Sequence, residues 1–381
     1  MIDQPPRIAI NAHLLAPRGT GGYRSAGIHV YTEQVLRHLP QADPDLRYTV
    51  FTAHPPSDLD PAIELQTSRW NTARPATRIA WEQIVQPRAT RRVKAAVLHD
   101  TAFVGPIVRP CPIVLTIYDL SFALYPQFFR GLKQTYLRIG TRYSAKRAKR
   151  IIAISDNTRR DIARLYQVPL DRIDLAYPGV DETIGRRSVV EVERFRSEKS
   201  LPNKFLLFLG TLEPRKNLPV LIRAFAQMKI DCPDAKLVLA GGFGWRTAEI
   251  FNTVKLAGVE DRVLWPGFVA SEEKTLWYSA ATAFVYPSIY EGFGLPPLEA
   301  MACGTPIIVS NAASLPEVVG AAGISIDPQD VNSWAAAMTR VWRDEAYRAE
   351  LAHRGLAQAQ KFRWIETARA TTSSYRRALE K

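Results

Sequence analysis

The chain has 381 residues, of which 46% are hydrophobic and 23% charged, and its formal net charge is +13. This composition is that of an ordinary soluble globular protein, and the length suggests two domains. No apolar run approaches the roughly 20 residues of a membrane span, and the N-terminus lacks a signal-peptide pattern. Three scattered cysteines argue against a disulfide framework or zinc site and favour a reducing compartment, so we expect a cytoplasmic protein.

Short apolar runs alternate with amphipathic segments along the chain. Each run is too short for a helix and is bounded by Gly, Pro, Asn, Asp or Ser, which favours buried strands between helices. Such an alternation predicts parallel sheets covered by helices on both faces. The predicted strands are 7–15, 48–53, 95–98, 113–117, 150–154, 173–177, 205–210, 236–240, 263–268, 283–286, 307–310 and 324–326.

The spacing of these runs predicts an α/β protein with two doubly wound domains. The boundary is expected after the segment 178–181, because 182–200 is polar and contains no strand-like run. We therefore assign residues 1–185 to a first domain, 200–362 to a second, and 363–381 to a C-terminal helix. Ligands of such sheets bind beyond the carboxyl ends of the strands, so two facing sheet edges create a cleft.

The segment 286–306 follows a predicted strand, opens a helix and contains two carboxylates separated by seven residues. Glu291 lies in the loop, and Glu299 follows on the helix. Gly292 and Gly294 allow close backbone approach to a ligand. Carboxylates accept hydrogen bonds from paired sugar or ribose hydroxyls, so this pair can bracket a polyhydroxyl ligand. The alternative is a helix-capping Glu291 and a surface Glu299.

Several motifs together resemble the large retaining glycosyltransferase family 4, which has the GT-B fold. The Glu291–Glu299 segment resembles its E-x₇-E signature, and the resemblance covers nearly the whole chain. Further matches are the S-x-x-T stretch at 155–158, Pro-Gly-Val-Asp at 178–181, the phosphate-loop-like segment 210–217, Leu-Pro-Glu at 315–317 and the end 362–364 with its helix. The resemblance implies that this last helix crosses back onto the first domain.

The resemblance also implies roles for individual residues. Glu299 would hold the donor ribose, and Glu291 would contact the donor sugar. Backbone N–H groups would hold the sugar or its phosphate, and a hydrophobic pair after strand 263–268 would border the nucleobase. The backbone groups are those of Phe293, Gly294 and Leu295, and the hydrophobic pair is Phe268 and Val269.

Arg215 and Lys216 follow the first strand of the second domain. Fixed cations stabilise the charge that grows on a leaving nucleoside diphosphate, so this pair is the predicted diphosphate clamp. Many family members have Gly-Arg at the start of this loop, whereas Thr211 follows Gly210 here, so Arg215 is expected to replace that arginine. The alternative is a solvated Arg-Lys pair in a turn.

The first domain contributes a glycine-rich turn and a strand end. Gly21 and Gly22 follow the first strand, and the resemblance places them opposite the donor phosphates. Tyr118 and Asp119 end the strand 113–117, where relatives often carry His-Asp. Tyr118 would orient the sugar or acceptor, and Asp119 is the candidate acceptor-side base. The alternatives are that Tyr118 packs and Asp119 caps the next segment.

No cofactor or metal ion is expected. The Asp pairs 43/45 and 58/60 lie in Pro-rich connectors and are interpreted as solvated loops. His99 is a weaker catalytic candidate, and His13 and His29 are expected to have structural or surface roles. The GT-B resemblance also implies a metal-independent reaction.

The stretch 130–150 contains eight Lys or Arg residues and no acid, with apolar residues at helical spacing. It predicts an amphipathic helix with a cationic face, which fits peripheral contact with an anionic membrane. The alternative is a solvated helix whose apolar stripe faces its own core. Nucleic-acid binding is not expected, because no recognised module focuses the charge.

The combined prediction is a retaining transferase that moves a sugar from a nucleotide-diphosphate sugar to a glycan or lipid-linked acceptor. The resemblance leans towards GDP-mannose and surface polysaccharide synthesis. A front-face displacement is favoured, because no carboxylate is securely placed as a nucleophile. Two alternatives remain, a GT-B nucleotide-sugar epimerase and a non-catalytic nucleotide-sugar-binding protein.

Overall fold

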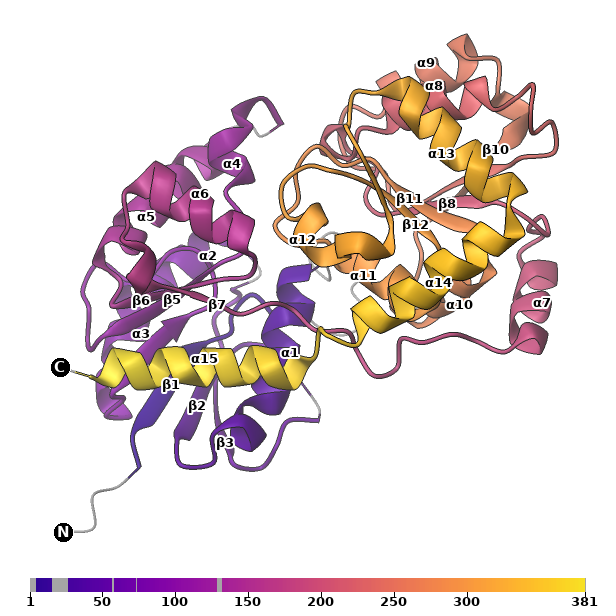
Figure 1. The fold of residues 1–381 in the computed structure, drawn as a ribbon. Helices are drawn as coiled ribbons and strands as arrows, with labels where there is room; N and C mark the ends of the chain where they lie inside the picture. Colours follow the sequence, from indigo (N-terminus) through magenta and orange to yellow (C-terminus); the bar gives the residue numbers. More distant parts are fainter. Residues whose placement is uncertain (1–4, 16–26, 57, 73, 129–131, 381) are drawn as a thin grey trace. The chain divides into compact units, whose positions relative to one another are not determined.

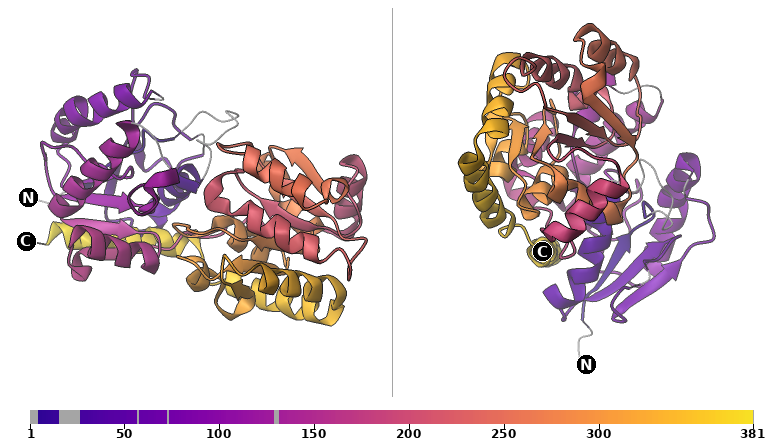
Figure 2. Two further views of the ribbon diagram at one scale, coloured as in Figure 1. Left: turned by 90° about the horizontal axis from the view of Figure 1, so that it is seen from above. Right: turned by 90° about the vertical axis from the view of Figure 1, so that its right-hand side faces the viewer.

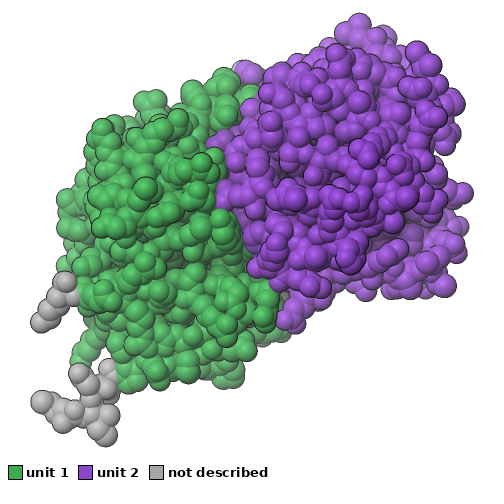
Figure 3. Space-filling model, in the orientation of Figure 1, with its two compact units in different colours: residues 1–179, 363–381 green, residues 180–362 purple. Residues whose placement is uncertain are grey.

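The computed structural model describes residues 5–15, 27–56, 58–72, 74–128 and 132–380. They form two compact units (Figure 3). The N-terminal unit comprises residues 1–179 together with 363–381, and the C-terminal unit comprises residues 180–362. Residues 180–199 belong to the C-terminal unit, whereas the sequence predicts 180–185 as the end of the first domain and 186–199 as a segment between the domains.

The N-terminal unit is built on a seven-stranded sheet with the order β3-β2-β1-β4-β5-β6-β7, in which every pairing is parallel (Figure 1). Its inner strands are buried on both faces, which is why they read as continuous apolar runs. The edge strand β3 was not predicted, because most of its side chains are exposed and break the apolar run. The strands are β1 (Arg7–Asn11), β2 (Arg47–Thr52), β3 (Ile63–Thr67), β4 (Val97–Asp100), β5 (Ile113–Ile117), β6 (Arg150–Ala153) and β7 (Ile173–Leu175).

Helices separate most strands of this unit, although none is described between β2 and β3 or between β4 and β5. The S-x-x-T motif has a local structural role, because the Ser155 hydroxyl caps α6 by accepting from Thr158 N at 3.0 Å. The helices are α1 (Gly27–Ala42), α2 (Pro75–Ala80), the π-helix η2 (Trp81–Val85), α3 (Gln86–Arg92), α4 (Ser121–Leu124), α5 (Leu132–Arg147) and α6 (Asp156–Tyr166), with 3₁₀ turns η3 (Pro126–Phe128) and η4 (Leu170–Arg172).

Helix α5 presents a different face to the core than its apolar pattern predicts. Ala145 and Ala148 are buried in the hydrophobic core beneath it, whereas Ile139 is 61% and Tyr143 41% exposed. The alternative in which the apolar stripe covers the protein's own core is therefore wrong for these two side chains. No helix in the described part of the chain is long and apolar enough to cross a membrane.

The C-terminal unit contains a six-stranded parallel sheet with the order β10-β9-β8-β11-β12-β13. The chain runs from β8 outward to β10 and then returns to the other side of β8 with β11. The carboxyl ends of β8 and β11 therefore flank the topological switch point, where open α/β sheets bind ligands. The strands are β8 (Leu206–Leu209), β9 (Leu237–Ala240), β10 (Val263–Gly267), β11 (Ala283–Tyr286), β12 (Ile307–Ser310) and β13 (Ile324–Ile326).

Two groups of helices cover this second sheet. Helix α8 contacts α9 and α13, whereas α11 contacts α10 and α14, and the two groups lie on opposite sides of the strands (Figures 1 and 2). The helices are α7 (Val189–Glu198), α8 (Leu218–Gln227), α9 (Ala248–Leu256), α10 (Lys274–Ala280), α11 (Leu295–Ala302), α12 (Leu315–Val319), α13 (Val331–Arg343) and α14 (Glu345–Ala359), with 3₁₀ turns η5 (Pro214–Lys216), η6 (Glu260–Arg262), η7 (Ser271–Glu273) and η8 (Gly320–Ala322).

The C-terminal helix α15 (Trp364–Leu379) returns to the N-terminal unit and packs along α1, as predicted (Figure 1). Its Tyr375 hydroxyl bonds with His99 Nδ1 at 2.7 Å. Gly179 of the Pro-Gly-Val-Asp motif lies against the start of this helix, and a Cβ there would meet Trp364 N at 2.2 Å. Only glycine permits this close approach of two backbone segments.

Candidate active site

Two loops of the C-terminal unit meet at the switch point. The loop after β8 carries Arg215 and Lys216 in the turn η5, which ends at Asn217 with a left-handed φ of 56°. The loop after β11 carries Glu291. A backbone bond from Ile289 N to Arg215 O, at 2.9 Å, joins the two loops. The structure thus brings the predicted diphosphate clamp and the first signature carboxylate together.

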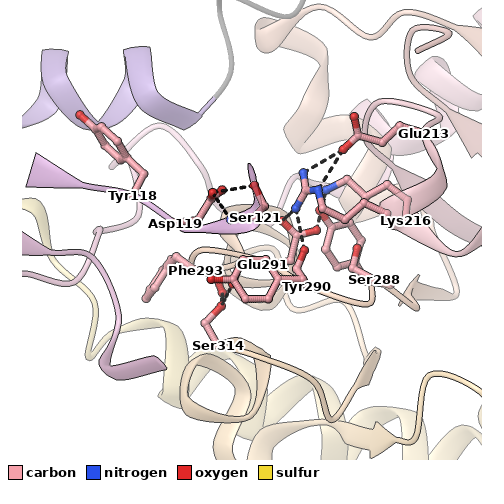
Figure 4. A network of polar contacts seen from close by, with 12 residues as sticks. Tyr118, Asp119, Ser121, Glu213, Lys216, Ser288, Tyr290, Glu291, Phe293 and Ser314 are labelled. Carbon is pink, nitrogen blue, oxygen red and sulfur yellow. Dashed lines mark hydrogen bonds and ion pairs between the residues drawn. The ribbon is translucent and has the colours of Figure 1, made fainter. Parts of the chain in front are cut away.

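Charged hydrogen bonds connect these side chains directly (Figure 4). Glu291 accepts from Arg215 Nη1 at 2.8 Å through Oε2 and from Lys216 Nζ at 2.6 Å through Oε1. Arg215 Nη2 also donates to Glu213 Oε1 at 2.8 Å, and Lys216 Nζ donates to the Tyr286 hydroxyl at 2.6 Å. The solvated Arg-Lys pair that we considered is therefore not what the structure contains. We call these five residues the switch-point network.

Burial strengthens the electrostatic interactions among the charged side chains of this network. Glu291 is 8% and Lys216 6% exposed. Burial alone would raise the pKa of the Glu291 carboxyl, but Arg215 and Lys216 outweigh it and lower that pKa to about 2. The carboxylate therefore stays ionised at neutral pH, and two cations and two carboxylates balance each other.

The Glu291 loop is held rigidly in front of helix α11. The Ser314 hydroxyl bonds with the carbonyl oxygens of Glu291 at 2.9 Å and Phe293 at 2.6 Å. Gly294 has a φ of 120° and precedes Leu295, the first residue of α11. The first N–H groups of a helix have no intrahelical acceptor, so this end suits an anion or a sugar hydroxyl.

Glu299 lies inside α11, where other side chains hold its carboxylate. Tyr278 donates to Oε2 at 2.8 Å, and Lys274 Nζ lies 3.3 Å from Oε1. The side chain of Glu299 is 12% exposed, so it is not the surface residue of the alternative interpretation. The predicted nucleobase pair follows β10, with Phe268 59% exposed and Val269 buried at 7%.

In the N-terminal unit the structure favours the structural alternatives for the strand end after β5. Tyr118 is 4% exposed, and its hydroxyl lies 3.1 Å from Thr32 Oγ1. Its ring points away from the neighbouring Asp119 (Figure 4). Asp119 Oδ1 accepts from Ser121 N at 2.9 Å and from Ser121 Oγ at 2.7 Å, so it forms an Asx turn directly before α4. Gly21 and Gly22 lie outside the described residues.

The buried histidines of this unit have structural partners. His99 bonds with Tyr375 and, at 2.8 Å, with Thr116 Oγ1, and burial lowers its pKa to about 3. His13 Nδ1 lies 3.1 Å from Thr72 Oγ1, and its ring packs on Trp81. Among the described residues, no cluster of three or more His, Cys, Asp or Glu side chains could hold a metal ion.

Several functional neighbours were missed in the sequence. Glu213 bonds to Arg215, Tyr278 to Glu299, and Ser314 to the carbonyls of Glu291 and Phe293, and each of the three comes from a different loop or helix. Glu213 lies two residues before Arg215, and this proximity was the one available signal. The others become neighbours only through packing.

Comparisons with known proteins agree with this geometry. Residues 189–358 match the family model "Glycosyl transferases group 1", and residues 25–183 match "Glycosyltransferase Family 4". The O-antigen chain mannosyltransferase B of Escherichia coli is 34% identical over 300 residues, which cover 77% of this chain and 78% of that protein. A serotype-specific mannosyltransferase of Escherichia coli is 32% identical over 242 residues, or 62% of this chain, and the match spans 29% of its length.

A sucrose-phosphate synthase structure from Thermosynechococcus elongatus shares the fold. The TM-score is 0.76 at 22% identity, and the match covers 97% of this chain and 98% of that one. Together with the signature carboxylates at the switch point, these matches identify the chain as a GT-B glycosyltransferase of family 4.

Proposed function

We propose that the enzyme transfers mannose from GDP-mannose to a glycan or lipid-linked acceptor, with retention of the anomeric configuration and without a metal ion. The observation that carries this proposal is the switch-point network, in which two buried cations and Glu291 converge at the ligand-binding edge of the sheet. The relative that is 34% identical is an O-antigen chain mannosyltransferase, which favours mannose and a polysaccharide acceptor.

In this proposal Arg215 and Lys216 bind the donor diphosphate. Charge grows on the leaving phosphate as the glycosidic bond breaks, and preorganised cations stabilise it more in the transition state than in the ground state. Glu291 orients the sugar, Glu299 holds the ribose, and Phe268 with Val269 borders the base. The start of α11, from Phe293 to Leu295, supplies N–H groups to the sugar or its phosphate.

The acceptor is proposed to bind the N-terminal unit near Asp119. Front-face displacement requires no protein nucleophile, because the acceptor oxygen bonds to the anomeric carbon on the face from which the nucleoside diphosphate leaves. The leaving phosphate oxygen helps to take the proton of the acceptor hydroxyl. We further propose a cytoplasmic enzyme that contacts the membrane peripherally through residues 130–150. The exposed Ile139 and Tyr143 among the basic residues of α5 support this contact.

The test is a transfer assay with a panel of nucleotide sugars and mannosylated acceptors, with product stereochemistry read by NMR. We expect mannose transfer from GDP-mannose with retention, in the presence of a chelator, and loss of transfer in Glu291→Ala. Glu260→Ala removes an exposed acid of the same unit and serves as the matched control. Transfer by Glu291→Ala at the parent rate would reject the proposed role of that residue. Isomerisation of the nucleotide sugar without acceptor would instead indicate an epimerase.

A further inference from the structure

A basic hollow lies at the opposite edge of the N-terminal sheet from Asp119. It encloses about 700 Å³ and is lined by residues at the amino-terminal starts of β5 and β6, before β7 and at the end of α15. Because Asp119 follows the carboxyl end of β5, this hollow is separated from it by the length of the strand, roughly 15 Å. We call it the basic hollow, and its charged lining residues are Arg109, Arg147, Lys149, Arg150, Arg172, Arg377 and Glu380.

The basic hollow carries a surplus of positive charge. Six basic side chains line it. Among the described lining residues and their ion-pair partners, the only acidic side chains are Glu380 and Asp174. The net charge of the hollow is therefore +4. Asp174 is 4% exposed and lies beneath the surface, where Arg150 Nε donates to its Oδ2 at 3.0 Å and Arg377 Nη1 lies 2.8 Å from its Oδ1. Asp174 thus holds the guanidinium groups of Arg150 and Arg377 in place.

Other cations of the hollow are anchored at the C-terminal end of α5. Arg109 Nη1 donates to the Arg147 carbonyl at 2.9 Å, and Arg172 Nη2 donates to the carbonyls of Lys146, at 3.3 Å, and Ala148. Guanidinium groups held this way have lost part of their conformational freedom before any ligand arrives. A fixed guanidinium matches the geometry of a phosphate group.

Exposed apolar side chains border this hollow. Ile139, Tyr143 and Arg147 are spaced four residues apart on α5, and the Arg147 guanidinium lies 5.1 Å from the centroid of the Tyr143 ring. Ile107 is 61% and Val108 54% exposed, immediately before Arg109, which the bond to Arg147 places beside α5. Exposed apolar and aromatic side chains therefore adjoin two lining residues of the cationic hollow, Arg109 and Arg147.

We propose that the basic hollow binds the phosphate headgroup of an anionic phospholipid while the apolar rim enters the membrane interface. This inference rests on the proposed membrane contact and adds the site, the ligand chemistry and the contribution of the C-terminal helix. Basic residues with an apolar rim are typical of interfacial binding to anionic lipids. Single-stranded nucleic acid binds by stacking of successive bases on planar rings, whereas Tyr143 is the one aromatic side chain among the four described rim residues and Ile107, Val108 and Ile139 are aliphatic.

The experiment is co-sedimentation of the full chain with vesicles of phosphatidylcholine alone and of phosphatidylcholine with about 30% phosphatidylglycerol. Arg109→Gln/Lys149→Gln removes two cations of the hollow, and we expect a weakening of about 25-fold on the anionic vesicles, or fivefold per cation. Arg194→Gln/Arg223→Gln removes the same charge from the C-terminal unit and is expected to change binding by less than about twofold. Ile139→Ser/Tyr143→Ser is expected to weaken binding without changing the net charge.

An equal loss of binding to anionic vesicles by the Arg194→Gln/Arg223→Gln control would show that the overall positive charge, and not the hollow, attracts the membrane. That result would overturn the proposal. So would unchanged binding by the hollow variant, or equal wild-type binding to the two vesicle compositions. Hollow-dependent capture of a single-stranded RNA in preference to anionic vesicles would also overturn it. Transfer to a soluble acceptor is measured in parallel and should be unaffected in the hollow variant. Lipid binding that depends on the hollow, in a protein that transfers no sugar, would instead reject the proposed function alone.

Discussion

Replacing Glu291 with glutamine should strengthen the binding of a free nucleoside diphosphate while abolishing sugar transfer. Glu291 neutralises Arg215 and Lys216 through bonds of 2.8 and 2.6 Å. A diphosphate that reaches the same cations must approach this carboxylate and compete with it. The amide introduced by Glu291→Gln keeps the size of the side chain and removes the competing charge.

The magnitude follows from Coulomb's law. A phosphate bound to both cations lies about 5 Å from the Glu291 carboxylate, and at an effective dielectric constant of about 20 two unit charges repel by about 3 kcal/mol. Screening by salt and loss of the charge-assisted bonds that position the cations reduce this gain. We expect about 2 kcal/mol, which corresponds to a roughly 30-fold lower Kd.

Isothermal titration calorimetry with GDP and UDP measures this affinity directly, and thermal unfolding confirms that the variant is folded. Glu260→Gln removes one exposed charge from the same unit and should leave the affinity within about twofold of the parent. Weaker or equal diphosphate binding by folded Glu291→Gln would refute the idea that this carboxylate competes with the donor phosphates. Transfer at the parent rate would refute its role in the reaction.

Three other perturbations test the described structure. Burial raises the pKa of Glu82 to about 8. The stability that the protonated side chain contributes is therefore fully present below about pH 4.5 and is lost as the pH rises through 8. The free energy of unfolding of Glu82→Gln, measured in urea, should exceed that of the parent by up to about 4 kcal/mol at pH 8.5 and by nearly nothing at pH 4. Tyr278→Phe removes the donor to Glu299 and should weaken nucleotide binding about fivefold in calorimetry, whereas an unchanged Kd would mean that this bond does not position the carboxylate. Gly294→Ala places a Cβ 2.8 Å from Leu315 Cδ2 at a φ of 120° and should lower the unfolding free energy by about 2 kcal/mol. Gly185→Ala, which meets nothing within 4 Å, is its control, and equal losses in the two variants would contradict the strain argument.

The buried parallel strands could be predicted from the sequence because both faces of each strand are covered, which makes them continuous apolar runs. The edge strand β3 has no such run, since only Ile63 of its five residues is buried. The loop of Glu291 could be predicted because its glycines, prolines and carboxylates are consecutive in the chain. The sequence predicts a structural feature well when the residues that determine that feature lie close together in the chain.

Features that depend on packing between distant segments could not be predicted. Tyr118 is a predicted site residue because it stands after a strand where relatives often carry histidine, but its burial and the bond between its hydroxyl and Thr32 of helix α1 could not be predicted from the sequence. Helix α5 buries the small residue Ala145 and exposes Ile139. The periodicity of apolar residues identifies an apolar stripe on a helix. It does not show whether that stripe packs against the protein's own core or against another surface.

Charge is distributed differently at the switch-point network and at the basic hollow. At the switch point, Glu213 and Glu291 balance the two cations, so the buried network carries no surplus of positive charge, and in the proposed function the donor competes with existing ion pairs. These ion pairs give Lys216 a partner, which matters because a buried charge without a partner is costly. The basic surplus of the chain therefore does not arise at the switch-point network. Part of it gathers in the basic hollow, where a net charge of +4 lies at the surface beside exposed apolar side chains and can act on a partner without disturbing the switch-point network.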